Sequence, residues 1–149
     1  MGSTVEQTVT RSGDLMAEGH SCAESVLMAV AAYHGVDNPL IPRMATGFGG
    51  GVARTGGICG AFTGGVLALG LLAGRDTPDT PVDETYVLVK RFVAAFEAAC
   101  GALDCPTLCG CDLTTEAGRA TFRAEGKFEV CQGFTRTATR LVLEVLAEA

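Results

Sequence analysis

The stretch that decides the fold is residues 58–74, ICGAFTGGVLALGLLAG, a run of 17 residues without a charged side chain. A helix that crosses a membrane needs about 20 consecutive apolar residues, so this run is too short for a span. Small residues let neighbouring backbones approach closely, and the run contains the glycines Gly60, Gly64, Gly65, Gly70 and Gly74. We therefore expect a buried helix at the centre of the fold and no membrane span.

Upstream of this run, apolar residues recur at intervals of three and four, which is typical of helices. A first helix is predicted over residues 4–18, with the inward residues Val5, Val9 and either Leu15 or Met16. A second is predicted over residues 22–35, because Ser21 and Glu24 form a capping-box pattern at its start. Its inner face is expected to carry Cys22, Val26, Ala29 and Tyr33.

Downstream, the clearest helix is predicted over residues 81–100. Pro81 stands near its first position, and Asp83 and Glu84 complement the positive end of the helix dipole. Its apolar stripe is expected to consist of Val82, Tyr86, Val89, Val93, Phe96 and Cys100. This helix should pack against the central one, and Cys100 is interpreted as a structural residue of the stripe.

Two further helices complete the expected fold. One covers residues 114–125 with Thr114 as its cap, and the last covers residues 130–147. The inner face of the last helix is expected to carry Cys131, Phe134, Ala138, Leu141 and Val145. Residues 47–57 are dense in glycine and are not expected to hold regular structure. The prediction is an all-α protein of residues 1–149, a compact single-domain bundle of about five to six helices around the central glycine-rich helix.

The charge and composition of the chain argue against some classes of function. The formal net charge is −6, and the 11 lysines and arginines are scattered, whereas binding to nucleic acid phosphates needs clustered positive charge. The first 15 residues have neither a basic nor an apolar region of the kind that signal peptides carry, so a cytoplasmic location is expected. The glycine-rich apolar surface favours a homodimer as the assembly.

Seven cysteines are many for a chain of 149 residues in a reducing compartment, where cysteine clusters usually serve metal or redox chemistry. Four of them fall at predicted helix starts, where free N–H groups and the helix dipole favour the thiolate: Cys22, Cys59, Cys105 and Cys131. Cys105 is interpreted as a cap because Pro106 follows it. We expect these four cysteines to converge on one site and to have lowered pKa values.

The chain resembles the C-GCAxxG-C-C family of redox-active proteins. The resemblance rests on Cys22-Ala23, on GICGAFTGG at residues 57–65, on CPTLCG at residues 105–110 and on Cys131. It implies a helical protein whose redox role depends on four motif cysteines, and it names no substrate. This sequence carries additional cysteines at Cys100, Cys109 and Cys111. The spacing favours Cys105 over Cys109 as the third motif cysteine.

Two functions fit these cysteines. In the first, Cys22, Cys59, Cys105 and Cys131 carry thiol–disulfide exchange or electron transfer with a redox partner protein or a small thiol or anion. In the second, the same four cysteines, with Cys109 as a further candidate ligand, hold an iron–sulfur cluster or zinc. Local Cys-x-x-Cys ligand pairs are absent, which favours thiol redox chemistry. A helical assembly domain with incidental cysteines is the third interpretation, and whether the protein is an enzyme stays open.

Three other residues are candidates for smaller roles. His20 stands two residues before Cys22 and is interpreted as solvated or, alternatively, as a ligand or base for the thiol. His34 is expected to complement the end of its helix. Arg54 is the sole charge between Arg43 and Arg75, and it is expected to hold either a thiolate, an anionic substrate or a surface carboxylate.

Overall fold

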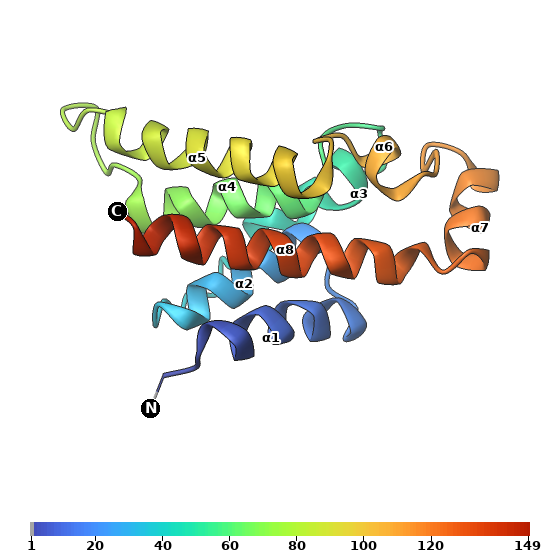
Figure 1. Ribbon diagram of the computed structural model, residues 1–149, viewed down its shortest axis with the longest axis horizontal. Coiled ribbons are helices and arrows are strands. Elements are labelled where there is room, and N and C mark those ends of the chain that lie inside the picture. Colours follow the sequence, from blue (N-terminus) through green and yellow to red (C-terminus); the bar gives the residue numbers. More distant parts are fainter. Residues whose placement is uncertain (1) are drawn as a thin grey trace.

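The computed structural model describes residues 2–149, and 69% of the chain is helical with no strand among those residues (Figure 1). The elements are α1 Val5–Ala17, α2 Cys22–Tyr33, the 3-10 helix η1 Arg43–Phe48, α3 Gly49–Val52, α4 Gly60–Ala73, α5 Asp83–Cys100, α6 Cys105–Cys109, α7 Glu116–Ala124 and α8 Lys127–Ala147. The all-α prediction is confirmed. Residues 2–149 form eight α-helices where five to six are expected. The short α6 begins at Cys105-Pro106, which already indicates a short turn of helix, and α3 forms in the glycine-rich loop of residues 47–57, where Gly50 and Gly51 depart from helical geometry.

The long helices pack side by side along one axis. Helix α8 is the longest, with 21 residues, and it contacts α1, α2, α4 and α5. Helix α7 projects beyond the end of the bundle and is attached through α8 (Figure 1). Within the described residues no helix is long and apolar enough to cross a membrane.

Helices α2 and α4 approach each other closely where α4 carries glycine. A Cβ atom added to Gly64 would lie 2.6 Å from the carbonyl oxygen of Ala23 in α2. Gly70, two turns later on the same helix, has no atom within 4 Å of the corresponding position. The glycines of α4 therefore serve different purposes, and only some of them permit close packing.

Replacing Gly64 with alanine is expected to lower the free energy of unfolding by about 1–3 kcal/mol, because the backbone of α2 must move to admit the methyl group. The matched control is Gly70→Ala in the same helix, which should raise it by roughly 0.5–1 kcal/mol because alanine restricts the unfolded chain. Urea denaturation of both variants measures the difference. Equal effects at the two positions would contradict the close approach of α2 and α4.

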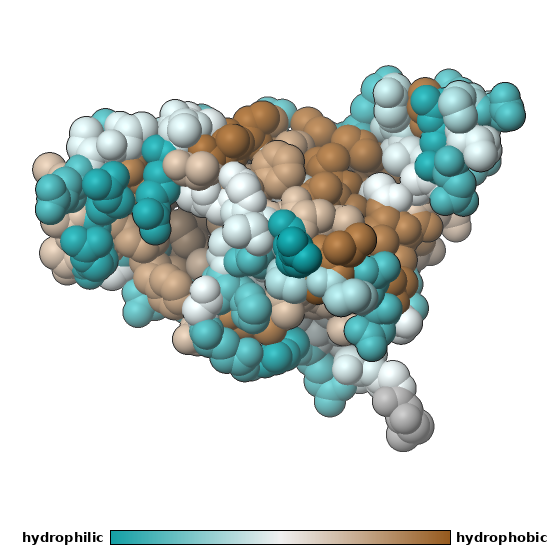
Figure 2. All heavy atoms as spheres, turned by 180° about the vertical axis from the view of Figure 1, so that it is seen from behind, coloured by the Kyte–Doolittle hydropathy of each residue, from teal (hydrophilic) through white to brown (hydrophobic). Residues whose placement is uncertain are grey.

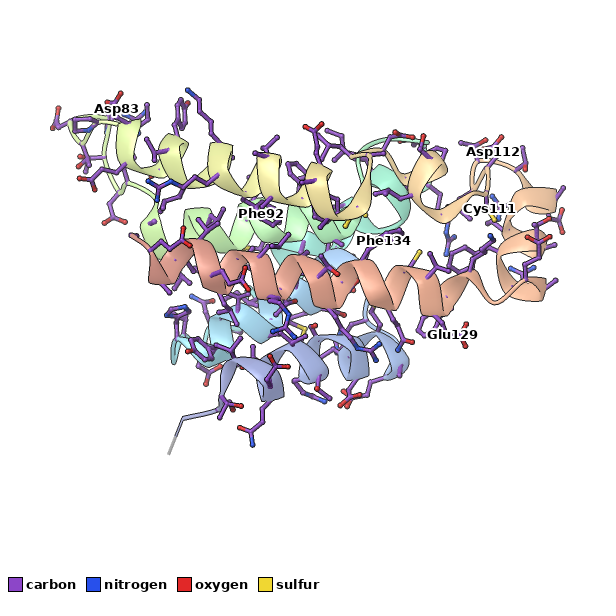
Figure 3. All side chains as sticks on the ribbon, in the orientation of Figure 1. Asp83, Phe92, Cys111, Asp112, Glu129 and Phe134 are labelled. Carbon is purple, nitrogen blue, oxygen red and sulfur yellow. The ribbon has the colours of Figure 1, made fainter. Side chains whose placement is uncertain are left out.

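The buried stripe of α5 differs from the expected one. Leu88, Phe92 and Phe96 are buried, whereas Tyr86 is 56% exposed. Phe92 stacks on Phe62 of α4 with ring centroids 5.3 Å apart, and Figure 3 shows it pointing inward from α5. The prediction that Tyr86 faces the core is wrong because the two buried phenylalanines set the rotation of the helix.

Some helix ends follow the predicted chemistry, and others do not. The backbone N–H of Ser21 donates to Glu24 at 2.8 Å, which confirms the capping box of α2. Thr115, not Thr114, caps α7, because Thr114 instead binds the carboxylate of Asp112. Helix α8 starts at Lys127, earlier than residue 130, because Gly126 adopts a left-handed conformation with φ 65° and serves as its N-cap.

Candidate functional site

One cavity of about 660 Å³ collects the four motif cysteines, although they are far apart in the chain. Cys22, Cys59, Cys105 and Cys131 all line it, at the end of the bundle where α2, α4, α6 and α8 meet. Figure 2 shows this side of the molecule hollowed between the lobe that contains α7 and the remainder of the protein. Such a volume suits a small ligand. The fold thus brings the four cysteines to one cavity.

The relation of each cysteine to its helix differs in detail. Cys22 is the first residue of α2, and Cys59 is the N-cap of α4. Cys105 is the first residue of α6 and not its cap, because the carboxylate of Asp104 caps the helix by accepting from the Thr107 N–H at 2.9 Å. The expected place of Cys131 in a first turn is wrong: with α8 starting at Lys127, it lies a full turn inside the helix. Three of the four therefore stand at helix starts.

The sulfur of Cys22 lies among backbone N–H groups from three segments. Its own N–H and that of Ala23 come from α2, the N–H of Ala61 comes from α4, and that of Gly50 comes from the glycine-rich loop. The N–H of Ala61 also faces the sulfur of Cys59, so these two sulfurs share a neighbour. Partial positive charge from two helix starts is thus concentrated where Cys22 and Cys59 meet.

The loop that supplies the Gly50 N–H has an unusual backbone. Five consecutive residues adopt left-handed conformations, namely Gly50, Gly51, Val52, Ala53 and Arg54, with φ between 54° and 76°. For a residue with a side chain this conformation costs about 1–2 kcal/mol. A Cβ atom on Gly51 would lie 2.6 Å from the Cβ of Cys105, so glycine is required for close approach to the cavity wall. Strain of this kind is typical of functional sites.

The pKa values of the four cysteines run opposite to the expectation. Burial raises the pKa of Cys22, and it raises the pKa of Cys59 and of Cys131 to about 12. The pKa of Cys105 is raised as well, first by burial and then by the neighbouring thiol of Cys109. Loss of hydration therefore outweighs the helix dipoles in the reduced protein. Because ionisation of one thiol disfavours ionisation of its neighbours, the four cysteines together favour at most one thiolate.

The three additional cysteines are not among the residues that line the cavity. Cys109 and Cys111 are buried in a small cluster with Cys105, and the Cys109 thiol donates to the carbonyl oxygen of Cys111 at 3.4 Å. Neither lines the cavity, which supports Cys105 as the third motif cysteine. Cys100 packs against the main core, as its place on the α5 stripe predicts, and its thiol is one of the groups that raise the pKa of Cys59.

The arrangement does not match a preformed metal site. Within residues 2–149, no three side chains of histidine, cysteine, aspartate or glutamate are grouped so that they could hold one metal ion. The donor set expected for an iron–sulfur cluster or zinc, with or without Cys109, is therefore not assembled in this conformation.

Other candidate residues find clear places. His20 and Arg54 line the cavity, and in the described part of the chain Arg54 forms no ion pair with a carboxylate. His34 is the C-cap residue of α2, as expected.

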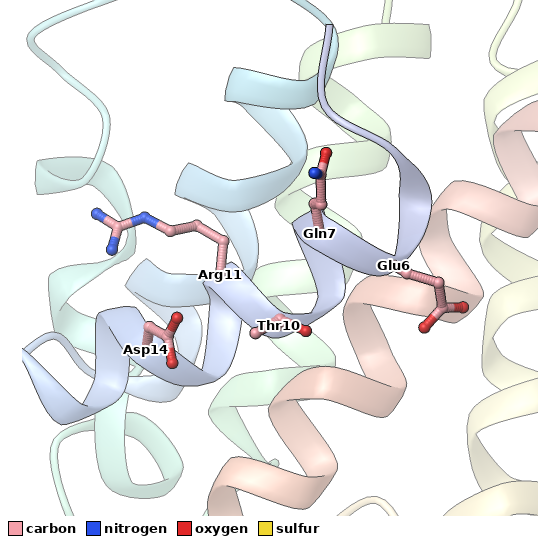
Figure 4. Close-up of a pocket in the computed structure, with 5 residues that line it drawn as sticks. All are labelled: Glu6, Gln7, Thr10, Arg11 and Asp14. Carbon is pink, nitrogen blue, oxygen red and sulfur yellow. The ribbon is translucent and has the colours of Figure 1, made fainter.

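A second hollow of about 350 Å³ lies along α1 and is lined by Glu6, Gln7, Thr10, Arg11 and Asp14 (Figure 4). All five belong to one helix and none is a cysteine, so it carries no site argument.

Sequence reasoning missed the contribution of α7. Arg119, Phe122 and Arg123 line the cavity beside the cysteines, and Phe128 joins them from the start of α8. The spacing of the three α7 residues, at i, i+3 and i+4, places them on one helix face. The sequence shows this spacing, so it predicts that the three side chains share a face of the helix. It does not show which part of the protein that face contacts.

Comparison with known proteins gives one match. A family model described as "Putative redox-active protein (C_GCAxxG_C_C)" matches residues 20–145. No curated protein and no solved structure matches the chain significantly.

Proposed function

The chain belongs to the C_GCAxxG_C_C family, and we propose that it is a thiol–disulfide redox protein acting through the four cysteines of its cavity. The observation that carries this proposal is the meeting of Cys22, Cys59, Cys105 and Cys131 at one cavity of about 660 Å³. Isolated core cysteines have no reason to face a common space. Thiols around a cavity can meet a substrate that enters it.

Cys22 is the attacking residue in this proposal. As a whole residue Cys22 is half-buried, as Cys131 is, whereas Cys59 and Cys105 are buried. Burial raises the pKa of Cys22, and the N–H groups of Gly50, Ala23 and Ala61 oppose that effect. The thiolate at Cys22 is thus supported by hydrogen-bond donors on three segments, and the thiolate is the nucleophile in disulfide exchange.

Cys59 resolves the intermediate. The Cys22 thiolate attacks one sulfur of a disulfide R–S–S–R, which forms a Cys22–S–S–R bond and releases one RS⁻ that takes up a proton. Cys59 then loses its proton and attacks the Cys22 sulfur, which closes a Cys22–Cys59 disulfide and releases the second R–SH. Two protein thiols are oxidised and one external disulfide is reduced to two thiols. The shared Ala61 N–H supports this pairing.

Cys105 and Cys131 supply the return path. Both line the same cavity. The Cys131 thiol raises the pKa of Cys105, after the stronger effects of Cys109 and Cys59, and Cys22 is the thiol that acts most on the pKa of Cys131. We place them as a second dithiol that exchanges with the Cys22–Cys59 disulfide, so that electrons pass between a partner and the substrate through one site. The partner is a redox protein or a small thiol.

The direct test is a single turnover of the reduced, anaerobically purified protein with hydroxyethyl disulfide. We expect the loss of two protein thiols for each disulfide consumed, and a Cys22–Cys59 bond in the peptide map. The same preparation is assayed for iron, zinc and visible absorbance. A stoichiometric metal held by the four cysteines, with no thiol oxidation by the disulfide, would contradict the proposal and favour the metal-binding alternative.

A further inference from the structure

The cysteine cavity has a positively charged wall in an acidic protein. Arg54, Arg119 and Arg123 line it, and Glu24 is its one acidic lining residue. The whole chain has a formal net charge of −6. The local excess of positive charge is therefore opposite in sign to the charge of the molecule, which is the pattern of a site that attracts anions.

Within residues 2–149 Glu24 forms no ion pair with these arginines, and its single negative charge leaves the positive charge of the cavity in excess. One of its carboxylate oxygens accepts from the backbone N–H of Ser21 at 2.8 Å, and the other accepts from the hydroxyl of Thr46 at 2.9 Å. The carboxylate is thus held at the start of α2, where it completes the capping box. The pKa of Glu24 is lowered by these hydrogen bonds although burial opposes them, so it stays charged in its structural role.

In the part of the chain that the structure describes, these arginines form no ion pair with an acidic residue. In residues 2–149 the ion pairs are Arg11–Glu18 and Arg140–Glu6, neither of which involves the cavity. Arg119 is half-buried, and its Nη1 donates to the carbonyl oxygen of Leu113 at 2.9 Å, which holds the guanidinium in place. Its other donors remain available.

We propose that the substrate of this cavity is a small disulfide that carries carboxylate groups, bound by Arg119 and Arg123 of α7 and by Arg54, which lines the same cavity. This inference rests on the proposed function and adds the class of substrate. Guanidinium groups bind carboxylates through paired hydrogen bonds. Phe122 and Phe128 form apolar wall beside the arginines, which suits the carbon chain of such a compound. A cavity of about 660 Å³ accepts a small molecule but not a folded partner.

The reaction is the exchange described above with charged R groups. The reduced Cys22–Cys59 dithiol is oxidised to a disulfide, and the dicarboxylate disulfide is reduced to two carboxylate thiols, with both protons coming from the cysteines. No other reactant is needed for this half of the cycle.

The test compares three symmetric disulfides in single-turnover reactions with the reduced protein. Dithiodiglycolate carries two negative charges, hydroxyethyl disulfide is neutral and cystamine carries two positive charges. We expect the anionic compound to react about tenfold faster than the neutral one, with cystamine slowest, and the advantage to shrink at high salt. The net charge of −6 alone predicts the reverse order, so the order of rates is diagnostic.

The variant Arg119→Gln/Arg123→Gln should lower the ratio of the anionic to the neutral rate by about tenfold. Helix α7 has no buried residue, so this change spares the core. The matched control is Arg91→Gln on the exposed side of α5, outside the cavity, which should leave the ratio as it is. Equal rates for the three compounds, or cystamine fastest, would overturn the inference. Failure of all three to oxidise the protein would instead overturn the proposed function.

Discussion

Replacing Cys59 with serine is expected to stop the reaction with hydroxyethyl disulfide at a mixed disulfide on Cys22. The attacking thiolate remains, but the thiol that resolves the mixed disulfide in the proposed reaction is gone. Serine is among the preferred N-cap residues, so it suits the position that Cys59 holds at the start of α4. Intact mass spectrometry should show one added R–S group per protein molecule, and peptide mapping should place it on Cys22.

Replacing Cys22 with serine should instead slow the first step by about two orders of magnitude or more, because a hydroxyl does not replace the attacking thiolate. The matched control is Cys100→Ala, which removes a thiol that packs against the core outside the cavity. It should cost modest stability and leave the rate unchanged. A Cys22→Ser protein that forms the mixed disulfide as fast as the unaltered protein would show that another cysteine attacks.

The sequence predicts the helices well where the local chemistry is explicit. The capping box at Ser21 and Glu24 places the start of α2, because hydrogen bonds between a side chain and a neighbouring backbone depend on a few residues alone. The rotation of α5 is a different case. The helical spacing of apolar residues allows either Tyr86 or Phe92 to lie on the buried face of α5. The packing of Phe92 on Phe62 of α4 decides that Phe92 is buried and Tyr86 is exposed.

Some features of the candidate site could likewise be predicted from the sequence, and others could not. The positions of Cys22 and Cys59 at helix starts follow from local signals, and the motif of the family connects them to Cys105 and Cys131. The left-handed loop before Cys59 does not follow, because three of its five residues, from Val52 to Arg54, are not glycine and give no sign of a positive φ. Burial is also a property of the folded chain, so the raised pKa values were not visible in the sequence.

The raised pKa values lead to a second prediction of large effect, on alkylation. A thiol whose pKa is about 12, as for Cys59 and Cys131, is ionised at neutral pH roughly 1,000 times less often than one with the ordinary pKa of 9.0. Iodoacetamide should therefore modify these two cysteines in the folded, reduced protein about 1,000-fold more slowly than in urea. The rate should rise about tenfold for each pH unit until the thiol ionises.

The same shift makes the stability of the reduced protein depend on pH, and the sign is fixed by the direction of the shift. Below pH 9 the thiol of Cys59 is protonated in both the folded and the unfolded chain. Between the unfolded pKa of about 9 and the folded pKa of about 12, the unfolded chain loses its proton and the folded chain keeps it, so stability falls as pH rises. For buried Cys59 the loss is on the order of 4 kcal/mol. Urea denaturation at pH 8 to 11 should show this fall, and Cys59→Ser should show less of it. Stability that is constant over this range in both proteins would mean that the thiol is not desolvated, and the cavity would then have to be open to water at Cys59.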